Sequence, residues 1–235
     1  MTTNAGLPAA MDAQAPHDLN CFMLLLPAST LVPSGPAPDR YFVYRHAVPL
    51  QLLDTAFPDI KLIALRQFAD ERGYFIEHFR AQEYQGLPGQ NGTFVQDNFS
   101  HSKRDVLRGL HFQNPNGQGK LVRAVQGSVY DITVDVRADS PTFGQWQALV
   151  LSSEEPRHLW IPPGYAHGFL VLSEQALVEY KCTAYYAPQS EACLRWNDPN
   201  LGIDWPCEAP LLSDKDRNGQ TLKELLEAGR CPAAN

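Results

Sequence analysis

The chain has 235 residues, enough for one domain with a substantial core, or for one domain and a tail. It carries 19 Lys and Arg against 26 Asp and Glu, a formal net charge of −7. This balance argues against nucleic acid as a partner, because phosphate backbones bind basic faces, but a few local cations could still hold a small phosphorylated ligand. The apolar run Cys21–Leu26 is too short to cross a bilayer, and no basic signal-peptide region precedes Arg40. We therefore expect a cytoplasmic protein without a membrane partner.

The cysteines are odd in number, and no pair has the C-x-x-C spacing of a zinc or redox motif. This usage favours free thiols in a reducing compartment over a framework of disulfides. The cysteines are Cys21, Cys182, Cys193, Cys207 and Cys231.

Residues 1–48 differ in composition from the rest, because they are rich in Ala, Pro, Ser and Thr and show no clear hydrophobic period. The proline-rich segment Pro33–Pro38 cannot form regular helix or sheet. We expect a poorly ordered extension, or else an arm that docks on a partner subunit through Cys21–Leu26. Residues 49–235 are expected to form the single folded domain.

From Leu52 onward the sequence has the pattern of short β-strands. Residues 130–136 alternate between apolar and polar side chains, which predicts a strand with one buried and one exposed face. Many short strands separated by Gly and Pro turns are typical of a β-sandwich or barrel. Further strands are expected at Gln147–Leu151, Gly168–Leu172 and Leu177–Thr183.

One helix is predicted near the end of the chain. Thr221 is a suitable N-cap, and an apolar stripe of Leu222, Leu225 and Leu226 ends before Gly229. The expected fold is therefore mainly β, with a short C-terminal helical segment.

The turn Pro162-x-Gly164-x-x-His167 resembles half of the second motif of cupins, which are jelly-roll (double-stranded β-helix) barrels. Metal-binding cupins take a His-x-His pair and a Glu from their first motif and another His from the second. Here the first motif falls at Gly109–Gln113 and supplies His111 alone, so His111 and His167 make a poor metal site. We expect a cupin-like barrel with no metal, and a metal-dependent cupin enzyme is the alternative.

A lone histidine such as His111 is most often structural, but three residues favour a chemical role. Arg108 could hold an anion, Lys120 could neutralise an oxyanion, and Tyr180 alternates with apolar residues toward an interior where its hydroxyl needs a partner. On an ideal strand Arg108 and His111 face opposite sides. Both reach one pocket only if Gly109 allows a bulge.

Seven segments spread from about Leu52 to about Leu226 carry motifs in a specific order. They are Asp70–Phe75, Phe94–Asn98, Val106–Gln113, Gly119–Arg123, Ser140–Gly144, Trp160–Gly168 and Tyr185–Pro188. In order and spacing these segments resemble the dTDP-4-dehydrorhamnose 3,5-epimerase family. One departure is Phe99, which stands where many members of the family carry His.

The resemblance implies a homodimer of jelly-roll subunits that uses no metal and no organic cofactor. The implied substrate is dTDP-4-dehydro-6-deoxy-D-glucose, and inversion at C3 and C5 gives dTDP-4-dehydro-L-rhamnose for dTDP-L-rhamnose biosynthesis. Both carbons flank the C4 ketone, so removal of either proton gives an enolate whose charge on the C4 oxygen must be stabilised. Close relatives invert one carbon only, so a mono-epimerase of a related dTDP-deoxysugar pathway is an alternative. A non-catalytic module that binds the sugar nucleotide is another.

The motifs also carry implied roles. His111 matches the base, and Asp216 matches the carboxylate that orients it. Tyr180 matches the acid on the opposite face of the sugar, Lys120 the cation near the C4 oxygen, and Tyr186 the aromatic that stacks on thymine. The residues that match positions contacting the nucleotide sugar are Arg72, Glu77, Gln96, Asp97, Asn98, Arg108, His167, Glu191 and Lys215.

Overall fold

The computed structural model describes residues 50–90 and 92–234. These residues belong to the second of the two units into which the chain divides, Arg45–Asn235. The expected extension at residues 1–48, with its possible arm at Cys21–Leu26, lies outside the described residues.

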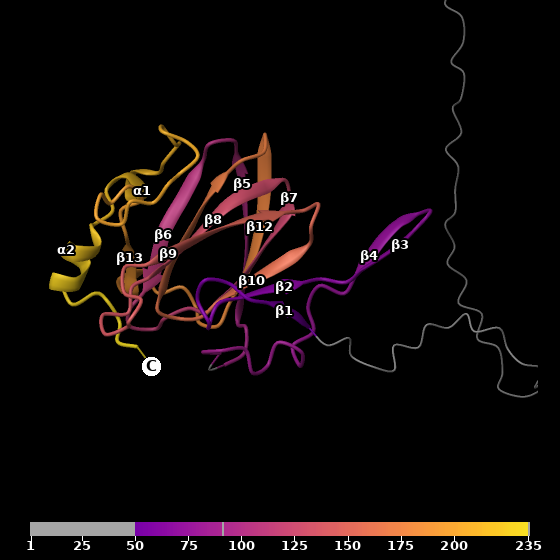
Figure 1. Ribbon diagram of the computed structural model, residues 1–235, viewed down its shortest axis with the longest axis horizontal. Coiled ribbons are helices and arrows are strands. Elements are labelled where there is room, and N and C mark those ends of the chain that lie inside the picture. Colours follow the sequence, from indigo (N-terminus) through magenta and orange to yellow (C-terminus); the bar gives the residue numbers. More distant parts are fainter. Residues whose placement is uncertain (1–49, 91, 235) are drawn as a thin grey trace, which may run out of the picture. The chain divides into compact units, whose positions relative to one another are not determined.

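The described residues form two antiparallel β-sheets that face each other, together with a separate hairpin (Figure 1). The six-stranded sheet consists, in spatial order, of β1 (Gln51–Leu53), β2 (Lys61–Ala64), β10 (Arg157–Ile161), β7 (Lys120–Gln126), β12 (Gln175–Cys182) and β5 (Gln96–Lys103). The five-stranded sheet consists of β13 (Glu191–Cys193), β6 (Leu107–Gln113), β11 (Tyr165–Val171), β8 (Ser128–Asp135) and β9 (Trp146–Ser152). The arrangement confirms the predicted mainly β, cupin-like jelly roll.

The hairpin and the short helices lie outside these sheets. Strands β3 (Gln67–Asp70) and β4 (Gly73–Ile76) pair only with each other and stand apart from both sheets (Figure 1). The helical segments are the 3-10 turn η1 (Pro188–Ser190), α1 (Asp214–Arg217) and α2 (Leu222–Glu227). Across the described ranges we find no helix with the length and apolar character needed to cross a membrane.

Helix α2 confirms the helix predicted from sequence. The Thr221 side chain accepts a hydrogen bond from the backbone N–H of Glu224, whose side chain accepts one from the Thr221 backbone, so the first turn is closed by a capping box. Leu222 and Leu225 are buried, but Leu226 is exposed. The apolar stripe is therefore narrower than predicted.

A cluster of buried apolar side chains joins the inner faces of the two sheets. It includes Val122 of β7 and Val178 of β12 from one sheet, and Phe169 of β11 from the other. Because side chains two positions apart share one face of a strand, Lys120, Tyr180 and His167 point into the same interior as these three residues. The apolar cluster thus sets the spacing of the sheets beside a group of polar side chains.

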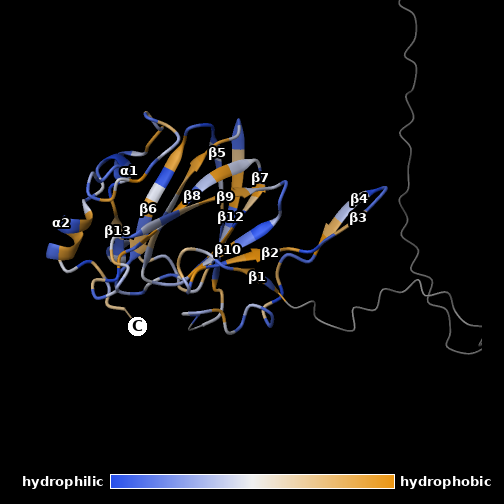
Figure 2. Ribbon diagram, viewed as in Figure 1, coloured by the Kyte–Doolittle hydropathy of each residue, from blue (hydrophilic) through white to orange (hydrophobic). Residues whose placement is uncertain are grey.

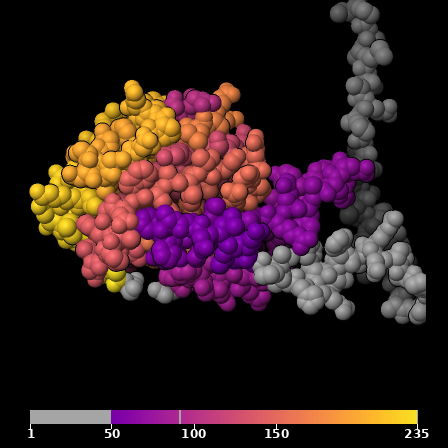
Figure 3. Space-filling model, viewed as in Figure 1, coloured from indigo at the N-terminus to yellow at the C-terminus, as the bar shows by residue number. Residues whose placement is uncertain are grey.

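Strand β8 corrects the prediction of a half-buried strand at residues 130–136. Asp131 is 1% exposed and Asp135 is fully buried, so the polar face is as buried as the apolar face. Ile132 and Val134 belong to a buried cluster that includes Leu222 and Leu225 of α2, and the C-terminal residues (yellow) lie at the surface on the left of the domain in Figure 3. Alternation therefore identified the two faces correctly but could not tell which of them other elements would cover.

Strand β6 contains a β-bulge, the irregularity that Arg108 and His111 need in order to face the same side of the strand. In its ladder with β11, His111 is opposite His167 and Arg108 is opposite Phe169. Two residues of β6 therefore face one residue of β11, which is a β-bulge. The bulge lets Arg108 and His111 line the same pocket, and Figure 2 shows that β6 carries both hydrophilic (blue) and hydrophobic (orange) positions.

The bulge depends on two glycines that touch across the ladder. Gly109 has a φ of +121°, a conformation that side chains rarely adopt. A Cβ at Gly109 would lie 2.6 Å from the Cα of Gly168, and a Cβ at Gly168 would lie 2.5 Å from the carbonyl oxygen of Arg108. The expectation that Gly109 allows a bulge is confirmed.

Candidate active site

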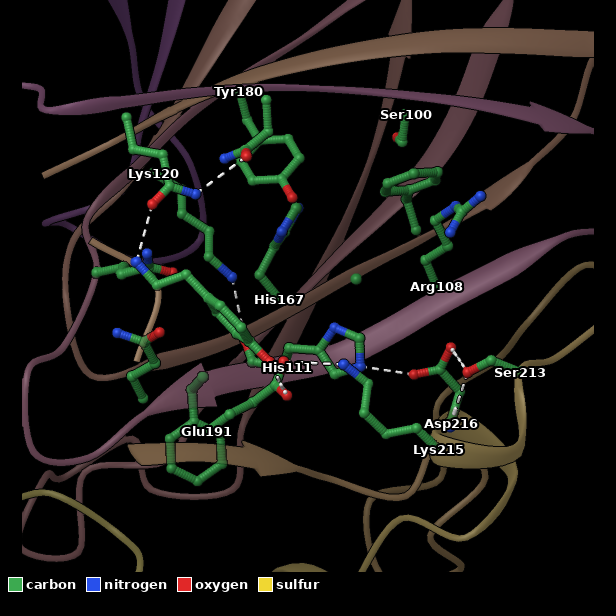
Figure 4. A pocket seen from close by; sticks show the side chains of 18 of the residues that line it. Ser100, Arg108, His111, Lys120, His167, Tyr180, Glu191, Ser213, Lys215 and Asp216 are labelled. Atoms are coloured by element: carbon green, nitrogen blue, oxygen red, sulfur yellow. Dashed lines mark hydrogen bonds and ion pairs between the residues drawn. The ribbon is translucent and has the colours of Figure 1, made fainter. Parts of the chain in front are cut away.

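A pocket of about 410 Å³ lies between the inner faces of the two sheets (Figure 4). Strands β5, β7 and β12 line it from one side, β6, β11 and β13 from the other, and α1 closes one edge. The site residues predicted from sequence that line this pocket are Gln96, Asn98, Arg108, His111, Lys120, His167, Tyr180, Tyr186, Glu191, Lys215 and Asp216.

His111 and Asp216, 105 positions apart in sequence, form a hydrogen-bonded pair. His111 Nε2 lies 2.6 Å from Asp216 Oδ1, and the Ser213 hydroxyl donates to Asp216 Oδ2 at 2.7 Å (Figure 4). An ionised carboxylate only accepts hydrogen bonds, so the imidazole donates through Nε2 and keeps the lone pair on Nδ1. Ser213 also caps α1 by accepting from the Asp216 backbone N–H, which fixes the carboxylate beside the ring.

The charge states of this pair suit proton abstraction. Burial lowers the pKa of the His111 imidazole below its usual value, Lys215 and Lys120 lower it further, and Asp216 partly opposes them. Burial alone would raise the pKa of the Asp216 carboxyl, but hydrogen bonds from His111 and Ser213 outweigh it and the pKa is lowered. At neutral pH the pair is therefore a neutral imidazole beside a carboxylate, the state that a general base requires.

Lys120 extends from one sheet to the other. It stands on β7, it is 9% exposed, and its Nζ donates to the backbone carbonyl of His111 at 3.2 Å. Burial lowers the pKa of its ammonium group, and the nearby Cys182, Asp131 and Glu191 oppose that shift. A buried cation beside the imidazole can stabilise negative charge on a ligand oxygen far better than a solvated one.

Tyr180 lines the pocket from the sheet opposite His111 (Figure 4). Its neighbours Val178 and Cys182 are buried, which confirms the predicted inward-facing side of β12. Burial raises the pKa of the Tyr180 hydroxyl, so the group remains a proton donor at neutral pH. Among the described residues this hydroxyl has no hydrogen-bond partner, which leaves it available to a ligand.

A second His–Asp pair lies beside the first. His167 Nε2 is 2.8 Å from Asp131 Oδ2, and both residues are buried. Sequence reasoning missed Asp131 because it was assigned to the exposed face of its strand, and no local signal distinguishes that face. It gave no role to Ser213, although the Ser-x-x-Asp spacing from Ser213 to Asp216 is an N-cap pattern that could have revealed one.

Charged and aromatic residues surround the mouth of the pocket. Lys215 Nζ lies 2.9 Å from Glu191 Oε1, and the hydroxyl of the exposed Tyr186 donates to Glu191 Oε2 at 3.0 Å. Arg108 and the exposed Phe99 also line this opening. Two cations and an exposed aromatic ring at one opening suit a ligand with an anionic group and a planar ring.

Strand β5 contributes several of its residues to the pocket, but not Asp97. Gln96 and Asn98 line it, and the Gln96 amide donates to Asn98 Oδ1 at 3.0 Å. Asp97, between them, points to the other face and forms an ion pair with Lys181 at 2.8 Å. The structure therefore does not bring Asp97 into this pocket.

Arg72 and Glu77 also lie outside the pocket of this chain. Arg72 is at the turn of the β3–β4 hairpin, where its guanidinium binds Asp70. Glu77 follows β4 and binds Arg80 through two hydrogen bonds of 2.5 and 2.7 Å. Both remain predicted ligand contacts that this single chain does not assemble.

The described residues include one group with the donor atoms of a metal site. Ligand atoms of His111, Cys193 and Asp216 all lie within 4.8 Å of one another. This is not the histidine set of metal-binding cupins, because His167 is absent from the group and pairs with Asp131 instead.

Comparisons with known sequences point to one family. The family model described as dTDP-4-dehydrorhamnose 3,5-epimerase matches residues 54–224. The protein of that name from Salmonella typhimurium is 51% identical over 177 residues, which cover 74% of this chain and 97% of the relative. Its counterpart from Pseudomonas aeruginosa is 52% identical over 170 residues, covering 72% of this chain and 94% of the relative.

Solved structures agree with the sequence matches. The dTDP-6-deoxy-D-glucose-3,5-epimerase from Legionella pneumophila, in complex with dTDP-4-keto-L-rhamnose, is 47% identical with a TM-score of 0.75, covering 79% of this chain and 99% of that one. A 3'-monoepimerase from Streptomyces bikiniensis, in complex with dTDP-quinovose, is 34% identical with a TM-score of 0.72, covering 76% of this chain and 91% of that one.

Proposed function

The chain belongs to the dTDP-4-dehydrorhamnose 3,5-epimerase family, and from that premise we propose that it inverts C3 and C5 of dTDP-4-dehydro-6-deoxy-D-glucose to give dTDP-4-dehydro-L-rhamnose. The observation that carries the proposal is the His111–Asp216 pair, which shares one pocket with Tyr180 on the opposite sheet. Inversion requires a proton to leave one face of a carbon and another to arrive on the opposite face, so an acid and a base from opposite walls fit the reaction.

His111 is the proposed base. Its Nδ1 takes the proton from the carbon beside the C4 ketone, and the electron pair of that C–H bond moves into an enolate. Asp216 stabilises the imidazolium that forms and holds the ring in the required tautomer through its 2.6 Å bond to Nε2. Negative charge then develops on the C4 oxygen, and the buried ammonium of Lys120 is the group proposed to stabilise it.

Tyr180 is the proposed acid. Its protonated hydroxyl gives a proton to the opposite face of the enolate carbon, which inverts that centre. The phenolate left behind regains a proton from solvent, and the His111 imidazolium returns its proton to solvent, so each inversion leaves the enzyme unchanged. The raised pKa of Tyr180 supports this role, because the hydroxyl is protonated at the start of each cycle.

The remaining pocket residues are proposed to hold the nucleotide sugar. Arg108 and Lys215 bind the diphosphate, because guanidinium and ammonium groups pair well with phosphate oxygens. Tyr186 stacks on thymine, and its exposed ring at the pocket mouth supports that assignment. The further sugar contacts proposed are Gln96, Asn98, His167 and Glu191, of which His167 is held in place by Asp131.

We also propose a homodimer in the cytoplasm. The β3–β4 hairpin carries Tyr74 and Phe75 at 63% and 54% exposure, and such a surface suits a protein–protein contact. The same segment carries Arg72 and leads to Glu77, so dimer formation through the hairpin is the proposed way in which they contact the ligand. The free thiols of the described cysteines are consistent with a reducing compartment.

Proton NMR of the reaction in D₂O tests the activity. The proposal expects solvent deuterium at both C3 and C5 of dTDP-4-dehydro-6-deoxy-D-glucose. Exchange at one carbon alone would assign the chain to the mono-epimerases, which one similar structure represents. No exchange at either carbon with folded protein would overturn the enzyme assignment. Elemental analysis of active protein tests the metal-dependent alternative.

A further inference from the structure

We propose that His111, Cys193 and Asp216 form an inhibitory binding site for Zn²⁺, which removes His111 from catalysis when the ion is bound. The proposed reaction does not use Cys193. Binding of the ion does not depend on the proposed function, whereas the inhibition does.

Three separate elements bring the donor atoms together. Cys193 of β13 is directly opposite His111 of β6 in their ladder, and Asp216 belongs to α1. Cys193 Sγ lies 3.9 Å from Asp216 Oδ1, and His111 Nε2 lies 2.6 Å from the same oxygen. All ligand atoms are within 4.8 Å of one another. Donors held by one tetrahedral zinc ion are roughly 3.5 Å apart, so the side chains need only small rotations.

The donor set determines which ions fit. A thiolate, an imidazole and a carboxylate are the ligands that Zn²⁺ and Co²⁺ accept, and a water molecule completes four-coordination. Mg²⁺ and Ca²⁺ prefer sites built of oxygen atoms and gain little from sulfur or nitrogen. The site is therefore selective for borderline transition-metal ions.

Cys193 gives the ion an approach that does not pass through the substrate pocket. Its side chain lines a second cavity of about 590 Å³, which shares Glu191 and Lys215 with the substrate pocket and also includes Asp214 and Arg230. His111 and Asp216 line the substrate pocket. The Cys193 and Asp216 side chains thus meet between the two cavities.

Coordination changes the protonation of His111. The Cys193 thiol loses its proton to solvent, and the proton on His111 Nε2 moves to Nδ1 so that the Nε2 lone pair can bind the ion. The thiolate and the Asp216 carboxylate together balance the charge of Zn²⁺. The imidazole then carries its proton on Nδ1, the atom that must accept the substrate proton, and it can no longer act as a base.

Removal of Cys193 separates metal binding from catalysis. Without the thiol only His111 and Asp216 remain, and two ligands hold zinc poorly. The contact from Cys193 to Asp216 is a weak sulfur interaction at 3.9 Å, so a serine in its place leaves the His–Asp pair essentially as it is.

Cobalt spectroscopy of the untagged full-length chain tests the binding. One equivalent of CoCl₂ is expected to give the thiolate-to-cobalt charge-transfer band in the near ultraviolet and the visible bands of tetrahedral cobalt. Cys193→Ser should lack the charge-transfer band, and the matched control Cys207→Ser should keep it. Absence of the band in wild-type protein, or its persistence in Cys193→Ser, would overturn the site.

Activity measurements with added ZnCl₂ in chelator-free buffer test whether the bound ion inhibits the enzyme. Wild-type activity should fall with added Zn²⁺, recover with EDTA and be unaffected by MgCl₂. Cys193→Ser should keep basal activity within about twofold, because the sulfur contact is weak, and should require at least about tenfold more Zn²⁺ for inhibition. Equal sensitivity of the two proteins would contradict the proposal. If neither protein shows epimerase activity, the proposed function fails, and the cobalt spectra still decide the metal site.

Discussion

His111 and His167 lie directly opposite each other in the ladder between β6 and β11, and each is hydrogen-bonded through Nε2 to a different aspartate. Their partners reach them from different directions. Asp216 comes from α1, at the edge of the pocket, whereas Asp131 comes from the strand beside β11. We assign the first pair to proton abstraction and the second to positioning of the sugar.

Substitutions at the two aspartates distinguish these roles. Asp216→Asn keeps a hydrogen-bond acceptor but removes the charge that stabilises the imidazolium, so we expect kcat to fall by about 10³-fold or more. Asp131→Asn should mainly raise KM, because it loosens a binding histidine. Initial rates with varied substrate measure both. If Asp131→Asn lost as much kcat as Asp216→Asn, the assignment of the base to His111 would be wrong.

Tyr180→Phe separates proton removal from inversion. The base is intact in this variant, but no acid stands on the opposite face, so His111 returns a solvent-derived proton to the face it came from. We expect product formation to fall by about 10²-fold or more, while deuterium still enters the recovered substrate with its configuration retained. Proton NMR in D₂O reports both quantities. Loss of deuterium exchange together with product would argue against separate acid and base.

Gly109→Ala tests the bulge that aligns Arg108 with His111. A methyl group there meets the Cα of Gly168 at 2.6 Å in a backbone conformation unfavourable for alanine, so we expect a loss of about 3 kcal/mol in the free energy of unfolding. Gly92→Ala is the matched control, because a Cβ at Gly92 would have no atom within 4 Å. Urea unfolding of both variants measures the difference, and equal stability of the two would contradict the strain argument.

The carboxyl group of Asp135 makes stability depend on pH. Burial alone would raise its pKa, but hydrogen bonds from Arg137, Ser140 and Thr142 outweigh the effect of burial and hold the pKa below the usual range of an aspartate. A lowered pKa in the folded state stabilises the fold above the unfolded-state pKa, and that contribution is lost as the pH falls through the folded-state pKa.

Asp135→Asn should therefore melt below wild type at neutral pH, and the difference in Tm should shrink as the pH falls below about 4. Thermal unfolding from pH 7 downward measures it. Asp54→Asn is the control, because the Asp54 side chain is 97% exposed and its loss should change Tm little at any pH. A gap that stays constant down to acid pH would refute the linkage.

Tyr186 and Tyr185 form a natural pair for testing recognition of the nucleotide. Tyr186 lines the pocket mouth, whereas the neighbouring Tyr185 is 71% exposed and lies outside the pocket lining. Tyr186→Ala should raise the KM for the dTDP-sugar about tenfold by removing the stacking surface, with little change in kcat. Tyr185→Ala should leave both constants near wild type. An equal effect of the two substitutions would point to a structural role of this segment.

The sequence predicted best those elements that are specified by residues close to one another in the chain. The cap at Thr221 and the alternation of Leu177–Thr183 depend on neighbouring residues alone. Helix α2 begins directly after the predicted cap, and β12 (Gln175–Cys182) begins two residues before the predicted strand and ends one residue before its end. The Gly109 bulge followed from strand parity, because a period of two leaves few ways for Arg108 and His111 to share a pocket.

Features that depend on contacts between distant parts of the chain were harder to predict from the sequence. Alternation could not show that Asp131 faces inward, since the element that covers the other side of β8 comes from the end of the chain. Spacing alone also could not pair Asp216 with His111 across 105 positions, and only the family motif suggested it. Arg72 and Glu77 lie outside the pocket of the single chain, and the proposed dimer is what would bring them to the ligand.

Lys120 belongs to one sheet, while the carbonyl it binds and the imidazole beside it belong to the other. The distance between this cation and the base is therefore set by how tightly the sandwich is closed. Val122 and Val178, which lie in the apolar cluster and not among the pocket residues, help to set that closure. A cavity made by shortening either side chain would change the separation of the sheets and, through it, the reaction rate. The packing of the hydrophobic core therefore helps to determine how strongly Lys120 stabilises charge at the active site.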